Sequence, residues 1–132
     1  MSEPRMSRER FTWKTNFSVL EDTATFALAE YQRVNSSCPD TRLDKSRKPL
    51  AWFVYNAENT ECIMHVSQNM NLPVNQIAIK DYSENMGALR CMKELGIIHD
   101  RALKYIRSGW VEIPVHLLTE KGMGIVQELG FA

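Results

Sequence analysis

The apolar residues of this chain are spaced in two ways, and the spacing divides the sequence into predicted helices and strands. From residue 19 to about residue 35 they recur every three or four positions, which is typical of an amphipathic helix. Ser18 and Glu21 form a capping box before this segment, because each side chain can satisfy a free amide of the first helical turn. We therefore expect a helix over 19–35.

Three further segments make up the rest of the expected helical core. The sequence predicts a helix over 60–70, and Ser83 is a good N-cap for a helix over 84–95 that Gly96 ends. The apolar run 50–55 is too short for its spacing to decide between helix and strand. We favour a helix there, because another predicted helix follows it directly.

After Gly96 the spacing changes to alternation between apolar and polar residues. Residues 98–106 and 110–118 read as two strands, and the short turn between them ends in Gly109. A turn of this kind predicts a β-hairpin, with the glycine at positive φ. Pro114 has no amide hydrogen to give to a sheet, so we expect the second strand at a sheet edge.

The remaining signals set the expected domain organisation. Thr119 caps a short last helix predicted over 120–129. Residues 1–16 are polar and are expected to be a flexible N-terminal arm. Residues 17–48 would contain the first helix and a polar linker, and residues 49–132 would form the main domain.

The order of predicted elements from about residue 60 to residue 129 resembles the winged helix-turn-helix superfamily. Residues 83–98 look like a recognition helix and its exit, and residues 117–122 look like the corner after the wing in MarR-type regulators. The resemblance implies an α+β, mainly α fold. Its parts would be a three-helix core, a two-stranded wing, an extra N-terminal helix and a short C-terminal helix.

The resemblance also implies that the protein binds duplex DNA, as a transcriptional regulator or an accessory factor of a mobile element. The recognition helix (84–95) would enter the major groove, and the wing (98–118) would lie over the backbone. Trp110 and Tyr105 are expected to seal the wing onto the core. The residues expected to contact DNA lie on the helix, the wing and the linker: Ser83, Asn85, Gly87, Arg90, Lys93, Arg101, Lys104, Arg107, Arg42, Lys45, Arg47 and Lys48.

The charge balance changes this picture. The 132 residues contain 16 Lys and Arg against 16 Asp and Glu, so the formal net charge is zero. A small nucleic-acid-binding protein usually has an excess of basic residues. Here the excess is only local and weak: residues 80–107 contain six basic residues and four acidic ones.

An alternative function is therefore a protein-interaction module, such as a subunit or an inhibitor of a larger complex. Glu84 and Gly87 are poor major-groove readers, because one is repelled by phosphate and the other has no side chain. A homodimer would use the 19–35 helix or the 50–55 segment. A continuous positive strip joining the 84–95 helix to the wing would favour DNA as the partner, and a mixed surface would favour a protein.

Other classes of function find no support in the sequence. Cys38, Cys62 and Cys91 are odd in number and widely spaced, which is typical of reduced cysteines in a cytoplasmic protein. The three histidines are equally scattered, so neither a metal site nor a cofactor is expected. No run approaches the roughly 18 apolar residues of a membrane span. Without a recognisable catalytic motif, we expect the protein not to be an enzyme.

Overall fold

The computed structural model of the chain describes residues 3–31 and 49–132. These residues form eight β-strands and two α-helices of seven and nine residues. The elements follow one another as β1 (Arg5–Met6), β2 (Phe11–Lys14), β3 (Val19–Glu30), β4 (Leu50–Asn56), β5 (Glu61–His65), β6 (Gln76–Ala78), the 3₁₀ turn η1 (Ser83–Asn85), α1 (Ala88–Glu94), β7 (Lys104–Ser108), β8 (Val111–Leu117) and α2 (Glu120–Glu128). The expected mainly α fold with a three-helix core is therefore wrong, and so is the winged-helix assignment.

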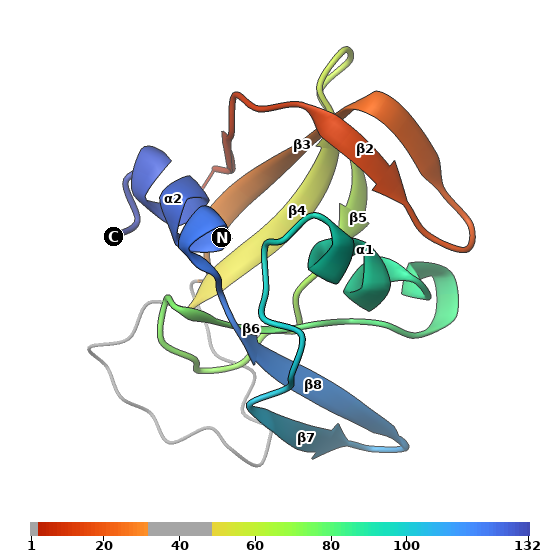
Figure 1. Cartoon of the computed structure of the whole chain (residues 1–132), viewed down its shortest axis with the longest axis vertical. Helices are drawn as coiled ribbons and strands as arrows, with labels where there is room; N and C mark the ends of the chain where they lie inside the picture. The colour runs from red at the N-terminus through yellow and green to blue at the C-terminus, as the bar shows by residue number, and fades with distance from the viewer. Residues whose placement is uncertain (1–2, 32–48) are drawn as a thin grey trace.

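A five-stranded antiparallel sheet forms the larger part of the molecule (Figure 1). Its central strand, β3, pairs with β1 and β2 along one side and with β4 along the other, and β4 pairs with β5. The contact between β3 and β4 runs from Ala24 opposite Asn56 to Glu30 opposite Leu50. The first strands, at residues 5–6 and 11–14, lie in the region that we expected to be a flexible arm.

The segment predicted as the first helix is strand β3 as far as the structure describes it. Residues 24–29 are all buried, because both faces of this central strand are covered. A strand buried on both faces contains an unbroken apolar run instead of an alternating one. Its spacing therefore resembles that of a buried helix, and the alanines at positions 24, 27 and 29 strengthen the false signal because alanine favours helices.

The next two predicted helices are also strands. Residues 50–55 lie in β4 and residues 60–70 contain β5. The β-branched and aromatic residues of β4 suit a pleated, buried surface, and residues 51–54 are buried within the sheet. The described parts of the two segments that we considered for a homodimer contact, 19–35 and 50–55, are thus largely occupied by pairing with each other.

The second sheet has three strands, in the order β6–β8–β7. The predicted hairpin is present as β7 and β8, but its bounds differ from those expected: the first strand covers 104–108 and not 98–106, and the turn is the two residues between Ser108 and Val111 and not 107–109. The expectation that its second strand lies at an edge is wrong, because β8 is the central strand of this sheet. Pro114 is tolerated because the pairing of β6 with β8 ends at Val115, so β6 does not need an amide hydrogen from Pro114.

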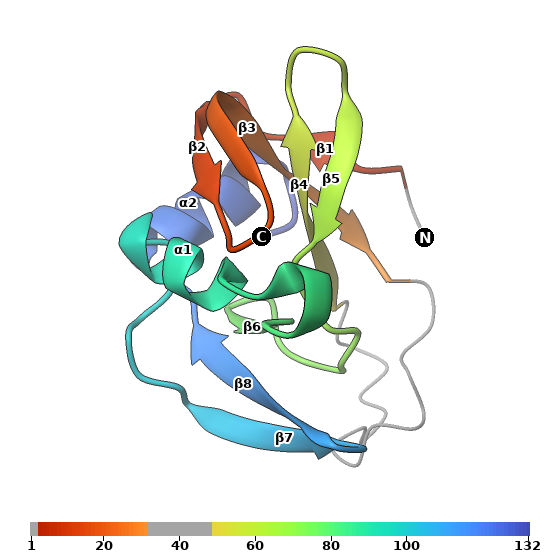
Figure 2. The same ribbon diagram turned by 90° about the vertical axis from the view of Figure 1, so that its right-hand side faces the viewer.

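The main core lies between one face of the five-stranded sheet and the two helices. Phe26 packs edge-on against both Trp13 and Trp52, with ring centroids 6.2 and 5.4 Å apart. Residues of α1 and α2 belong to the same cluster. Figures 1 and 2 show the five-stranded sheet towards one end of the molecule and the β7–β8 hairpin at the other, with α1 between them. Neither α1 nor α2 is long and apolar enough to cross a membrane.

Candidate functional site

The segment expected to be a recognition helix is short and packed against the core. Helix α1 starts only at Ala88, and Ser83 lies in the η1 turn with a φ of +53° instead of capping a helix. The start of α1 is stabilised by Asp81, whose carboxylate accepts hydrogen bonds from the amides of Gly87 (3.0 Å) and Leu89 (3.1 Å). The helix predicted over 84–95 is therefore wrong in length, in its start and in its cap.

The five residues expected to read DNA from that helix do not form one face. The Asn85 side chain is buried and donates a hydrogen bond to the His65 carbonyl at 2.8 Å. Gly87 is buried against the β2–β3 turn. Ser83 and Arg90 are exposed, and Lys93 is half-buried. Asn85 and Gly87 thus have structural roles, which removes the centre of the expected base-reading surface.

The three basic residues expected on the wing are exposed, as predicted. Arg101 precedes β7, while Lys104 and Arg107 lie on it. Arg107 is directly opposite Glu112 across the hairpin, and its Nε donates to the Gly109 carbonyl at 3.4 Å. The four linker residues, Arg42, Lys45, Arg47 and Lys48, lie outside the described residues.

The two aromatic residues of the hairpin do not seal it onto the core, contrary to our expectation. Trp110 is 97 % exposed and Tyr105 is 65 % exposed, whereas Trp13 and Trp52 are completely buried. Trp110 occupies the second position of the two-residue turn, after Gly109 at a φ of +61°. We had placed Trp110 at the start of the second strand, whereas a side chain in this turn projects beyond the sheet and does not reach its buried face.

The surface between α1 and the hairpin has mixed charge. The exposed charged side chains from residue 84 to residue 112 are four cations and four anions, namely Arg90, Arg101, Lys104 and Arg107 with Glu84, Glu94, Asp100 and Glu112. The two signs are interspersed along the chain, with Asp100 next to Arg101 and Glu112 opposite Arg107. These exposed residues therefore do not form a series of positive charges alone from α1 to the hairpin.

A polar cluster joins Tyr31, just after β3, to His65 at the end of β5 and to Ser67, and no site was expected at these residues. The Tyr31 hydroxyl is 2.6 Å from His65 Nε2 and 3.2 Å from Ser67 Oγ, and Ser67 Oγ accepts the Trp52 amide hydrogen at 2.9 Å. Burial lowers the pKa of His65 to about 4, with a further contribution from the Lys80 charge, and burial raises the pKa of Tyr31 to about 12. Both groups are therefore neutral at pH 7.

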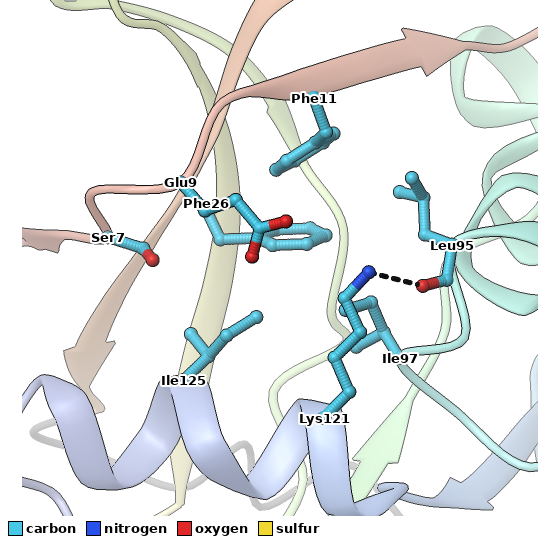
Figure 3. A pocket seen from close by; sticks show the side chains of 8 residues that line it. All are labelled: Ser7, Glu9, Phe11, Phe26, Leu95, Ile97, Lys121 and Ile125. Atoms are coloured by element: carbon cyan, nitrogen blue, oxygen red, sulfur yellow. Dashed lines mark hydrogen bonds between the residues drawn. The ribbon is translucent and has the colours of Figure 1, made fainter.

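Figure 3 shows a pocket between α2, β3 and the segments around Ser7 and Leu95. Its walls include the rings of Phe11 and Phe26, whose centroids are 4.4 Å apart, and Lys121 Nζ donates to the Leu95 carbonyl at 3.0 Å beside it. Its cavity volume of about 10 Å³ has room for about one water molecule. We therefore treat this pocket as a packing gap at the edge of the core and not as a ligand site.

The described part of the chain contains no group of three or more His, Cys, Asp or Glu side chains placed to hold a metal ion. Cys62 is exposed and Cys91 is buried, and both are unpaired. Burial raises the pKa of both thiols, so neither is an activated nucleophile at neutral pH.

Comparisons with protein-family models, with curated proteins and with solved structures gave no match.

Proposed function

We propose that this protein is an interaction module that binds a partner protein through its β7–β8 hairpin. The observation that supports this most directly is the exposure of Trp110. Its side chain lies in the turn of the hairpin and is 97 % exposed. A tryptophan side chain presents a large apolar area, and leaving it in water forgoes the free energy that burial would contribute. Exposed apolar side chains that gather on one element mark interaction sites, and Leu103 and Tyr105, before and on β7, are exposed as well.

The neighbours of Trp110 fit the composition of a protein-binding hot spot. Tyr105 and Arg107 are two positions apart on β7, so their side chains lie on the same face of the hairpin. Tryptophan, tyrosine and arginine are the residues most enriched among those that dominate binding energy. Asp100 and Glu112 add negative charge, which suits a partner surface of mixed charge better than a phosphate backbone.

This proposal assigns the protein a role as a subunit or an inhibitor of a larger complex, without a catalytic role of its own. It includes a cytoplasmic location, which is supported by the unpaired state of the two described cysteines.

Nucleic-acid binding by the same hairpin is the second candidate, and the exposure of Arg101, Lys104 and Arg107 on and before β7 favours it. Basic side chains can contact phosphates while an aromatic ring stacks on a base. This candidate does not depend on a recognition helix, and it predicts binding that weakens steeply with salt.

Site-specific photo-crosslinking in the native host separates the two candidates. A photoreactive amino acid replaces Trp110 in one variant and Glu58, exposed in the β4–β5 turn, in a control variant. We expect discrete protein adducts from position 110 alone, resistant to nuclease and lost when Tyr105→Ala and Arg107→Ala are added. Nuclease-sensitive adducts would support the second candidate, and the same adducts from both positions would contradict both.

A further inference from the structure

A second site lies away from the hairpin, in a cleft between strand β5 and residues 80–85. Its cavity volume is about 210 Å³, which is enough for a small organic molecule or ion. The residues that line it are Ile63, Met64, His65, Lys80, Tyr82, Glu84 and Asn85. This cleft is much roomier than the pocket in Figure 3, and most of its lining side chains are polar.

The His65 ring in this cleft is held in a fixed orientation. It stacks on Phe53 with ring centroids 4.5 Å apart and planes inclined by 28°. The Tyr31 hydroxyl is hydrogen-bonded to His65 Nε2, with 2.6 Å between the oxygen and the nitrogen. The Asn85 side chain, bonded to the His65 carbonyl, fixes the backbone of the same residue. A ring with this much support does not need to reorient when a ligand arrives.

The hydrogen bonds of Tyr31 bear on which ring nitrogen of His65 carries the proton. Ser67 Oγ accepts the Trp52 amide hydrogen, and its own proton is available for the Tyr31 oxygen at 3.2 Å. The Tyr31 hydroxyl keeps its proton at neutral pH and has three acceptors in reach: His65 Nε2 at 2.6 Å, Ser67 Oγ at 3.2 Å and the Ser67 carbonyl at 3.5 Å. The contact with Nε2 is the shortest, and donation along it places the hydrogen of the neutral imidazole on Nδ1, which makes no hydrogen bond within the described part of the chain.

Lys80 supplies a positive charge to the same cleft. It is half-buried, makes no ion pair with any described residue, and is close enough to His65 to lower the pKa of the imidazole. Tyr82 brings a hydroxyl that donates to Gln68 at 3.4 Å, a long bond that a better acceptor would replace. Glu84 lines the cleft and is exposed, and its negative charge repels anions, most strongly those with a high charge.

We propose that the cleft binds a small oxyanion, a carboxylate or a phosphate, with the Lys80 ammonium as its counter-charge and the His65 Nδ1–H as an oriented hydrogen-bond donor. Charge-assisted hydrogen bonds of this kind are stronger than neutral ones, and the partial burial of Lys80 limits their screening by water. This inference is independent of the hairpin and of its partner.

The test is an NMR titration of the full chain that observes the ring nitrogens of His65. Sodium acetate and inorganic phosphate are added separately, and the anion that binds more tightly shows whether the cleft prefers a carboxylate or a phosphate. We expect the unliganded protein to show the Nδ1-protonated tautomer. On addition of the anion, the signals of both ring nitrogens should shift and reach a plateau. Lys80→Gln should weaken binding about tenfold, Glu84→Gln should strengthen it, and Lys14→Gln, a matched charge change on exposed β2, should leave it unchanged.

Tyr31→Phe separates the positioning role of the hydroxyl from general stability. Without the hydroxyl, the ring is expected to change towards a mixture of tautomers and to bind the anion more weakly while the chain stays folded. An Nε2-protonated ring in the unchanged protein would overturn the donor assignment. Chemical-shift changes that rise linearly with the anion concentration would contradict the proposed site. Equal affinities of the Lys80→Gln and Lys14→Gln variants for the anion would contradict it as well.

Discussion

Gly87 packs so closely against Asn16 that a Cβ atom on residue 87 would lie 2.9 Å from both the backbone nitrogen and the side-chain oxygen of Asn16. The contact joins the start of α1 to the β2–β3 turn, and the Asn16 amide donates to the Met86 carbonyl at 2.9 Å nearby. It explains why the segment before α1 is an irregular turn held against the sheet and not the first turn of an exposed helix.

Replacing Gly87 with alanine should therefore destabilise the fold strongly. The substitution combines a φ of +104° with two backbone contacts that cannot move away, the Asn16 nitrogen at 2.9 Å and the Thr15 Cα at 3.0 Å, so we expect a loss of about 3 kcal/mol in the free energy of unfolding. Gly109→Ala is the matched control, because its φ is also positive but no atom lies within 4 Å of the added Cβ. It should cost only about 1 kcal/mol. Equal urea midpoints for the two variants would refute the packing argument.

The exposure of Trp110 can be measured by fluorescence. Trp13 and Trp52 are completely buried, so Trp110 is the tryptophan that a soluble quencher such as acrylamide can reach. We expect Trp110→Phe to remove most of the quenchable emission and to shift the remaining spectrum to the blue. The free energy of unfolding should change by less than about 0.5 kcal/mol. A red-shifted, quenchable emission in the variant would show that the core tryptophans are not protected.

The proposed hairpin surface illustrates how far the sequence could lead. The existence of a hairpin around Gly109 is a local property, and it was predicted correctly, although its first strand and its turn were displaced. The exposure of Trp110 was missed, because we assumed that a large aromatic residue would be buried. We also placed Trp110 in the second strand, whereas it lies in the two-residue turn, which brings its side chains beyond the sheet.

The central sheet was beyond the reach of sequence spacing for a physical reason. Strand β3 is held by partners far away in the chain, including the pairing of Ala24 with Asn56 and of Arg5 with Leu28. Burial on both faces erased the alternation that marks a strand, and the alanines then favoured a helix. The His65 cluster was missed for a related reason, because Tyr31 and His65 come together only when β3, β4 and β5 pair, and Lys80 joins them through the bond of its amide to the Val66 carbonyl.

The low pKa of His65 predicts an acid-sensitive fold. In the unfolded chain histidine titrates near 6.5, whereas in the fold His65 titrates near 4. Between these values the unfolded state binds the additional proton, so stability is complete above pH 6.5 and falls as the pH approaches 4. Because the ring is only partly buried, we expect a loss of about 1–2 kcal/mol. His65→Gln should flatten this part of the stability profile measured by urea unfolding, and an unchanged slope would refute the assignment to His65.

The capping role of Thr119 was predicted from the sequence, and the structure gives it a second function. Its hydroxyl accepts the Gly122 amide hydrogen at 3.2 Å at the start of α2, and it donates to the Gly96 carbonyl at 2.5 Å, with the Ile97 carbonyl 3.1 Å away. Thr119→Ala removes these contacts and leaves partly buried groups without a partner, so we expect a loss of about 1–2 kcal/mol. Thr119→Ser keeps the hydroxyl and should recover most of that loss in thermal or urea unfolding. If serine destabilised the fold as much as alanine does, the methyl group and not the hydrogen bonds would be what stabilises this end of α2.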